Sequence, residues 1–327
     1  MTFCACECED RAAELSRLII VENRVRGSIA GFVLLSAFAL VESAHAAAPR
    51  FVTEIPFRDC DGLICIEVAL DGAPARTLML DTGNANSTLI TDVAKALNWK
   101  LEPAQRNGGN VPGIFRGGDH RVTLGNVQMP APFFVFDREL LGAYKPPVDG
   151  SLAYNFFKDR VLEIDYPHHV LRISNIISTP VPDRPEGAGS LKLITFGDNG
   201  PPIVVGSPFS INGKPVRAQI DTVFTGTMLI YDSAIDRLGL KKQGATTLFR
   251  YTDGGVNLIT ADAQSIGFAG RTILDGKPPL YFPGEGKNPV HQPDNLFEAT
   301  VGNALFARSV VTMDFHAMTL DVRPAAP

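Results

Sequence analysis

One short motif constrains this chain more than any other feature: an apolar run that ends on an acid and then turns at once. Residues 77–90 read TLMLDTGNANSTLI, so the apolar run delivers Asp81 into a loop that continues with Thr and Gly. A near copy follows 140 residues later, where residues 216–230 read VRAQIDTVFTGTMLI and place Asp221 before a second Thr. Two carboxylates delivered by two similar segments predict one shared site.

The similarity of the two halves extends well beyond the acids. Residues 153–157, 161–166 and 170–173 align without a gap with residues 302–306, 310–315 and 319–322, at a constant offset of 149 residues. An offset of this size indicates duplication of a domain-sized unit and not the short period of a solenoid. We therefore predict an N-terminal lobe over residues 47–179 that carries Asp81, a Pro- and Gly-rich linker over 180–190, and a C-terminal lobe over 191–327 that carries Asp221.

Glycine, proline and hairpin signals predict the class of the fold. The chain has 30 Gly and 24 Pro between short runs of Val, Ile, Leu and Phe, which favours many short strands and turns over long helices. Asp71-Gly72 and Asn212-Gly213, each ahead of one acid, are strong hairpin signals. After each acid loop comes a helix-compatible segment, residues 92–97 and 232–238, whose first Asp is placed to cap it. We expect a mainly β chain in two similar halves.

Charge and histidine content argue against two classes of function. The formal net charge is −5 and no cluster of Lys and Arg is present, so the sequence lacks the electrostatic footprint of a nucleic-acid-binding protein. The six His are scattered or paired, without the His-Glu-x-x-His motif or the Cys partner that would indicate a zinc hydrolase. We expect neither a metal nor a cofactor.

The N-terminal residues have the features of a segment that is removed during export. Two Arg precede an apolar run over residues 29–41, and Ala44-His-Ala46 supplies small residues at the positions that signal peptidase reads. This predicts residues 1–46 as a signal peptide with an over-long N-terminal extension, cleaved after Ala46, and a periplasmic or secreted mature protein. A retained anchor is the weaker alternative, because the apolar run is shorter than the roughly 20 residues that span a membrane. After signal removal we expect a monomer without stable membrane insertion.

The cysteines divide between the predicted extension and the mature chain. Cys4, Cys6 and Cys8 lie in the extension and lack the second ligand group of a metal cluster, so we assign them no role in the mature protein. Cys60 and Cys65 remain after cleavage, on either side of an Asp-Gly turn. An oxidising compartment permits a disulfide between them, and the alternative is a pair of small, buried apolar side chains.

Two aspartates at hydrogen-bonding distance have a specific chemistry. They cannot both ionise, so the pair holds one proton and titrates in two steps. One carboxylate can then deprotonate a bridging water while the other protonates the substrate carbonyl or the leaving group. The hydroxyls of Thr82 and Thr222, directly after the acids, are placed to bond to the opposite loop and to hold the two carboxylates coplanar. This combination predicts amide hydrolysis without a metal or a covalent intermediate.

These motifs match a known family. Asp81-Thr-Gly83 with its apolar lead-in, and residues 148–153 and 299–302 as second motifs behind the acid loops, resemble the bilobal aspartic proteases of the pepsin and retropepsin-like clan. The resemblance covers nearly the whole predicted mature chain. It implies two similar, six-stranded β lobes with an active-site cleft between them. It also implies an aspartic-type endopeptidase in which Asp81 and Asp221 are the catalytic dyad and a peptide or protein is the substrate.

The family resemblance also draws attention to a Gly-rich run between the motifs of the first half. In the pepsin-like members a flap in this region carries a Tyr, and here Gly113, Ile114 and Phe115 are the candidate flap residues, with Phe115 as the stand-in. The run is either a hairpin that covers the cleft or a long surface loop.

One position departs from the family pattern beside the second acid. The family has Gly where this chain has Val223, and a β-branched residue is poorly suited to a positive φ or to a close approach of substrate. We therefore keep a second hypothesis, a catalytically impaired homologue that retains the cleft and binds peptides. Thr82, Gly83, Thr222 and Val223 form the supporting loops of the site under either hypothesis.

Overall fold

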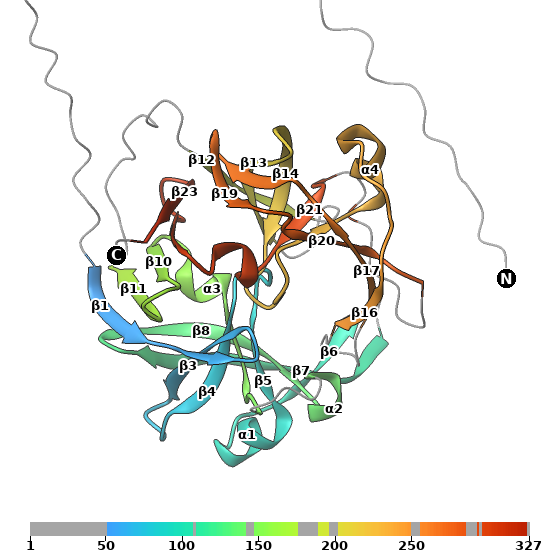
Figure 1. Ribbon diagram of the computed structural model, residues 1–327. Helices are drawn as coiled ribbons and strands as arrows, with labels where there is room; N and C mark the ends of the chain where they lie inside the picture. Colours follow the sequence, from blue (N-terminus) through green and yellow to red (C-terminus); the bar gives the residue numbers. More distant parts are fainter. Residues whose placement is uncertain are drawn as a thin grey trace, which may run out of the picture. The chain divides into compact units, whose positions relative to one another are not determined.

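The computed structural model describes residues 51–106, 109–141, 147–175, 189–195, 202–249, 256–285, 293 and 296–325. The predicted signal peptide over residues 1–46 and most of the predicted linker lie outside the described residues. Within them the chain is mainly β, which confirms the class predicted from the sequence (Figure 1). None of the described helices is long and apolar enough to cross a membrane.

The first of two sheets is built from strands around Asp81. Its eight strands lie in the order β2 (Arg58–Cys60), β3 (Leu63–Leu70), β4 (Arg76–Asp81), β9 (Gly150–Ala153), β5 (Ser87–Ile90), β8 (Val127–Phe136), β7 (Gly109–Leu124) and β6 (Glu102–Arg106). Interior strand β4 lies between β3 and β9 and ends on Asp81. A strand held on both sides fixes the backbone that leads into the acid.

The second sheet has 15 strands and combines both halves of the chain. Its main order is β1 (Phe51–Pro56), β11 (Val170–Ser174), β10 (Val161–Asp165), β22 (Ser309–Asp314), β23 (Thr319–Pro324), β12 (Gly189–Thr195), β13 (Pro202–Ile211), β14 (Lys214–Ile220), β21 (Ala299–Val301), β15 (Met228–Ile230), β20 (Pro279–Pro283), β17 (Val256–Asp262) and β16 (Thr246–Phe249). In addition, β18 (Ser265–Phe268) pairs with β13, and β19 (Arg271–Asp275) pairs with β18.

Strands β1, β10 and β11 of the first half share this sheet with the strands of the second half. β10 pairs antiparallel with β22, so the predicted division between the halves is not a division between sheets. Strand β12 begins inside the predicted linker. Gly189 and Ser190 belong to β12, because they pair with Leu320 and Thr319 of β23.

Equivalent strands of the two halves pair in the same register. β4 runs parallel to β9 with Leu78 opposite Gly150, and β14 runs parallel to β21 with Ala218 opposite Ala299. These positions are related by the two sequence offsets, 140 and 149 residues. The repeat inferred from the sequence therefore extends to strand pairing.

Both predicted hairpins form at the predicted turns. Asn212 and Gly213 have φ values of 51° and 78° and connect β13 directly to β14. Asp71 and Gly72, with φ values of 53° and 80°, begin the longer connection from β3 to β4. Two successive positive φ values match the right-handed twist of the flanking strands, which explains the Asx-Gly pairs.

The two predicted helices also form, but their capping was predicted incorrectly. α1 spans Thr91–Ala96 and α4 spans Asp232–Leu238, with Ile90 and Tyr231 at the N-cap positions and no side-chain cap. Asp92 and Asp232 lie in the first turn, where a carboxylate interacts with the positive end of the helix dipole. The remaining short helices are α2 (Arg138–Leu141), α3 (Tyr154–Phe157) and the 3-10 helix η1 (Asn303–Phe306).

The main hydrophobic core is continuous across the two halves. The ring of Phe306 lies 5.8 Å from that of Tyr166 and 6.3 Å from that of Phe209, measured between centroids. Phe306 is 1% exposed, and burial of such a side chain stabilises the folded state by about 1.5–3 kcal/mol. Packing from both halves thus supports the segments that carry the acids.

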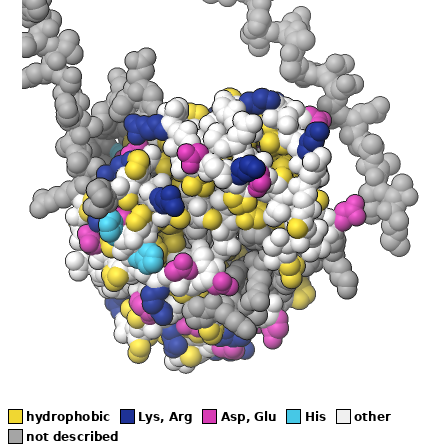
Figure 2. Space-filling model, viewed as in Figure 1, with side chains coloured by type: hydrophobic (Ala, Val, Ile, Leu, Met, Phe, Trp, Pro, Cys, Tyr) yellow, Lys and Arg dark blue, Asp and Glu magenta, His cyan; other side chains and the backbone are white. Residues whose placement is uncertain are grey.

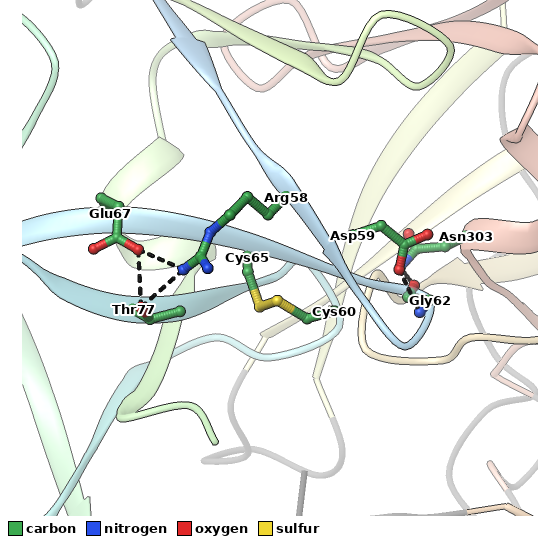
Figure 3. Close-up of a disulfide and its surroundings, with 8 residues drawn as sticks. All are labelled: Arg58, Asp59, Cys60, Gly62, Cys65, Glu67, Thr77 and Asn303. Atoms are coloured by element: carbon green, nitrogen blue, oxygen red, sulfur yellow. Dashed lines mark hydrogen bonds and ion pairs between the residues drawn. A yellow bond between two sulfur atoms is a disulfide. The ribbon is translucent and has the colours of Figure 1, made fainter. Parts of the chain in front are cut away.

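Cys60 and Cys65 form a disulfide, which decides between the two alternatives left by the sequence. Figure 3 shows this bond joining β2 and β3 on either side of the turn at Gly62. Both half-cystines are also buried, at 2% and 1% exposure. Beside them the Arg58 guanidinium donates to Glu67 at 2.7 Å, on the same pair of strands.

Candidate active site

The two acid loops meet, although their sequences lie 140 residues apart. A Cβ atom placed on Gly83 would lie 2.4 Å from Cγ of Asp221, so the first loop touches the second carboxyl directly. Only glycine fits at this contact without a displacement. Asp81 is 8% exposed, whereas Asp221 is partly exposed.

The threonines after the acids exchange hydrogen bonds across the site. The Thr82 N–H donates to Thr222 Oγ1 at 3.0 Å, and the Thr222 N–H donates to Thr82 Oγ1 at 3.3 Å. The Thr82 hydroxyl donates to the Ile220 carbonyl at 2.9 Å, and the Thr222 hydroxyl donates to the Leu80 carbonyl at 2.6 Å. The bonds to the opposite loop expected from the sequence are therefore present, in a reciprocal arrangement that holds both acid loops.

Burial and mutual repulsion disfavour ionisation of Asp81. Burial raises the pKa of Asp81, and the negative charge of Asp221 raises it further. Hydrogen bonding from the Asn84 N–H, the Ser151 hydroxyl and the Gly83 N–H opposes both effects and lowers the pKa. The balance leaves the pKa well above the ordinary value of 3.8, so that Asp81 retains a proton where an exposed carboxyl would lose it.

Val223 supports the second acid through its backbone. Its N–H donates to Asp221 Oδ1 at 2.9 Å, while its partly buried side chain packs against the main core. Val223 and Gly83 are not among the described residues with positive φ. Val223 therefore does not adopt the left-handed backbone conformation that disfavours a β-branched residue. Burial raises the pKa of Asp221 as well, against hydrogen bonds from the N–H groups of Val223 and Phe224.

The candidate flap residues lie within a paired strand. Gly113, Ile114 and Phe115 belong to β7, with Phe115 opposite Val135 of β8 and Pro103 of β6. Phe115 is partly buried and packs against the core. The residues thus belong to a hairpin, and no described contact joins them to the aspartates. That this hairpin covers a cleft stays a prediction.

Asn303 ties the second acid loop to the first half of the chain. Its Nδ2 donates to the Thr222 carbonyl at 2.6 Å and to the Gly62 carbonyl at 2.8 Å, and Tyr166 donates to its Oδ1 at 3.0 Å. Figure 3 shows Asn303 beside Gly62 at the turn between β2 and β3. No sequence pattern pointed to this role, because it depends on contacts between residues up to 241 positions apart.

Gln219 makes a second link between the acid loops that the sequence did not reveal. Its Nε2 donates to the Gly83 carbonyl at 3.0 Å, and its Oε1 accepts from the Thr300 hydroxyl at 3.3 Å. The equivalent position in the first half is Met79, which cannot form such bonds. The position of Gln219 itself is the sequence feature that could have indicated this link, because it places a polar side chain among the apolar residues before Asp221.

Metal ligation and surface charge add no further site. Among the described side chains, no three of His, Cys, Asp and Glu are grouped to hold a metal ion. On the face shown in Figure 2, Lys and Arg are interspersed with Asp and Glu. The sequence matches no known protein-family model and no curated protein.

Proposed function

We propose that this chain is an aspartic-type endopeptidase that hydrolyses peptide bonds with a water activated by Asp81 and Asp221. The observation that carries the proposal is the reciprocal bonding of Thr82 and Thr222, which holds two carboxyls of raised pKa in adjoining loops. The fold we infer has two β lobes of the pepsin-like type, with the acids at the cleft between them.

The chemistry follows from one proton shared between two carboxyls. The ionised carboxylate takes a proton from the bridging water, whose oxygen attacks the peptide carbonyl carbon. The protonated carboxyl gives its proton to the carbonyl oxygen, and the proton taken from water later passes to the leaving nitrogen as the C–N bond breaks. No electron transfer and no covalent enzyme intermediate is needed.

The substrate class is a peptide or protein, and the compartment is outside the cytoplasm. The extracellular or periplasmic location rests on the N-terminal pattern and agrees with the disulfide between Cys60 and Cys65, a bond typical of oxidising compartments. We infer that the working protein is a monomer that uses no cofactor.

Val223 supports a second candidate function, a homologue that binds peptides without cleaving them. Its side chain occupies the place where the family has glycine, next to an acid that is only partly exposed. Substrate backbone has less room to approach Asp221 there than it has at a glycine.

The test is cleavage of a peptide library by the purified, exported chain between pH 3 and pH 8. We expect cleavage on the acid side of neutrality, inhibition by a statine-type peptide, and loss of cleavage in Asp81→Asn and in Asp221→Asn. The matched control is Asp314→Asn, because Asp314 accepts from two backbone N–H groups at the end of β22 and not within the acid loops.

The outcomes separate the two candidates. Full activity in either dyad variant would exclude the proposed mechanism. Peptide binding without cleavage, with cleavage appearing in Val223→Gly, would instead support the binding protein.

A further inference from the structure

A cavity of about 250 Å³ lies beside the second acid loop. Its lining comes from four separate parts of the chain: the segment that forms β2 and the turn into β3, the turn between β10 and β11, Thr225 after the second acid, and η1 with the residue that follows it. Asn303 ties three of these parts together through its bonds to Tyr166, Gly62 and the Thr222 carbonyl. The volume is just below the usual range for ligand pockets, about 300–1,000 Å³, and suits a small ligand.

One wall of the cavity is aromatic and apolar. The Phe57 ring stacks on the His169 ring, with centroids 5.1 Å apart, and meets the Tyr166 ring edge-on at 6.5 Å. Phe57 is 7% exposed, and Leu63 and Ile64 are each 2% exposed. Such a wall can cover the carbon skeleton of a ligand, and the face of an aromatic ring attracts a cation within about 6 Å.

Three side chains that line the cavity have unused hydrogen-bonding capacity. Asp59 Oδ1 accepts from the Gly62 N–H at 2.7 Å, while Oδ2 has no partner among the described residues. The same holds for the ring nitrogens of His169 and for the Thr225 hydroxyl. Figure 3 shows Asp59 beside Gly62 and Asn303. A carboxylate, an imidazole nitrogen and a hydroxyl can all accept hydrogen bonds.

The charge of the lining favours a cation. Asp59 is the single acidic residue in the described lining of the cavity, and that lining contains no Lys or Arg. The neighbouring Arg58 donates to Glu67 at 2.7 Å, so its guanidinium is engaged elsewhere (Figure 3). An ammonium group has three donors and no acceptor, which matches a negative site that offers acceptors.

We propose that this cavity is a binding site for a small organic amine, whose ammonium group binds at Asp59 with Thr225 and His169 as further acceptors, and whose apolar skeleton packs against Phe57. The inference goes beyond the proposed function, because it involves neither aspartate of the dyad and requires no peptide cleavage. Asn303 lines the cavity and donates to the Thr222 carbonyl, so the site adjoins the second acid loop.

The experiment is a proton–nitrogen-15 NMR titration of the full exported protein with benzylamine near neutral pH. Benzyl alcohol and benzoate are the matched neutral and anionic probes, because they keep the ring and change the charge. We expect saturable shifts of the Gly62 and Thr225 amide signals with benzylamine, and affinities for the other two probes that are at least about fivefold weaker.

The test variant is Asp59→Asn, which removes the charge but keeps an oxygen that can accept the Gly62 N–H. Its matched control is Asp61→Asn, which removes an acid from the same turn that does not line the cavity. Asp61 has a φ of 62°, a conformation that Asn readily adopts. Ala304→Leu, at an exposed position of η1, places a larger side chain in the cavity.

We expect benzylamine affinity to fall about fivefold to tenfold in Asp59→Asn, to stay within about twofold of wild type in Asp61→Asn, and to be lost in Ala304→Leu. The inference would be overturned by the absence of saturable shifts at millimolar benzylamine, by equal or tighter binding of benzyl alcohol or benzoate, or by equal losses in the two Asp variants. The comparison of the three probes uses wild type alone, so it decides the matter even if a variant folds poorly.

Discussion

Glu163 of β10 lies directly opposite Thr312 of β22, and these two residues are each other's counterparts at the offset of 149. When equivalent positions of two antiparallel strands face each other, a local twofold axis passes between them. The axis explains why β10 and β22 join the two halves of the chain within one sheet. Glu163 itself breaks the symmetry, because its carboxylate accepts from Arg172 and Arg323 at 2.8 Å each and from Thr312 at 3.2 Å.

We expect Glu163→Gln to destabilise the protein by about 2–3 kcal/mol, since it removes a carboxylate, 5% exposed, that accepts hydrogen bonds from both Arg172 and Arg323. The loss is limited because Arg172 keeps Glu54 and Asp165 as partners. Urea unfolding measures the effect, with Thr312→Val as the control that removes only a neutral donor. A smaller loss for Glu163→Gln than for the control would contradict this account of the junction.

The reciprocal threonine bonds predict strong coupling between two distant positions. Thr82→Val and Thr222→Val each remove a hydroxyl donor and an acceptor in a buried region, which costs about 1–3 kcal/mol. Each hydroxyl also accepts a hydrogen bond from the backbone N–H of the other threonine. The double variant should therefore lose less stability than the sum of the losses in the two single variants. A double-mutant cycle measures the coupling, Thr→Ser at each position is the control, and strict additivity would argue against mutual bracing.

The raised pKa of Asp81 predicts that folding stability falls as pH rises. A carboxyl whose pKa is higher in the folded than in the unfolded protein stabilises the fold below its unfolded value, near 3.8, and loses that contribution as pH rises through the folded value. Asp81→Asn removes the ionisable group, so its stability relative to wild type should increase above pH 4 by up to about 1.4 kcal/mol per pH unit. Thermal unfolding between pH 4 and pH 7 checks this, and a pH-independent difference would count against a raised pKa.

Asp71 predicts the opposite pH dependence. Partial burial raises its pKa, but hydrogen bonds from the Arg121 N–H, His120 and Trp99 outweigh burial, and the net pKa is lowered. The folding stability that comes from the lowered pKa is present above pH 4, and it is lost as pH falls through the folded-state pKa of Asp71. Asp71→Asn should therefore cost about 1 kcal/mol near neutrality, a modest value because the side chain is 38% exposed, and should match wild type in strong acid.

Under the proposed function, the contact between Gly83 and Asp221 predicts a site-specific loss of peptide cleavage. Gly83→Ala introduces a Cβ 2.4 Å from Cγ of Asp221, which must displace the carboxyl and should reduce cleavage by about 100-fold. Gly226→Ala is the control, because its Cβ would meet the Phe224 ring at 2.5 Å and cause similar overpacking without touching either acid. Equal losses of cleavage at equal stability would show that the contact with Asp221 has no special importance.

Much of the local structure could be read from the sequence because it depends on neighbouring residues. Asn212-Gly213 forms its hairpin because two adjacent residues with access to positive φ suffice for that turn. The offsets of 140 and 149 residues predicted which strands are equivalent, and the two Asp-Thr pairs predicted the central residues of the candidate site. The helix caps were predicted incorrectly because Ile90 and Tyr231 occupy the positions assigned to Asp92 and Asp232.

What the sequence by itself determined about this protein is therefore the β class, the repeat and the two acids with their threonines. Only the tertiary structure decided which polar side chains join the segments around the two acids. Ser151 is 63 residues from Thr88, and Gln219 is 136 residues from Gly83, so no local pattern links the members of either pair. Such bonds form because buried polar groups must find partners among whatever side chains the folded chain brings together, and that requirement acts in three dimensions.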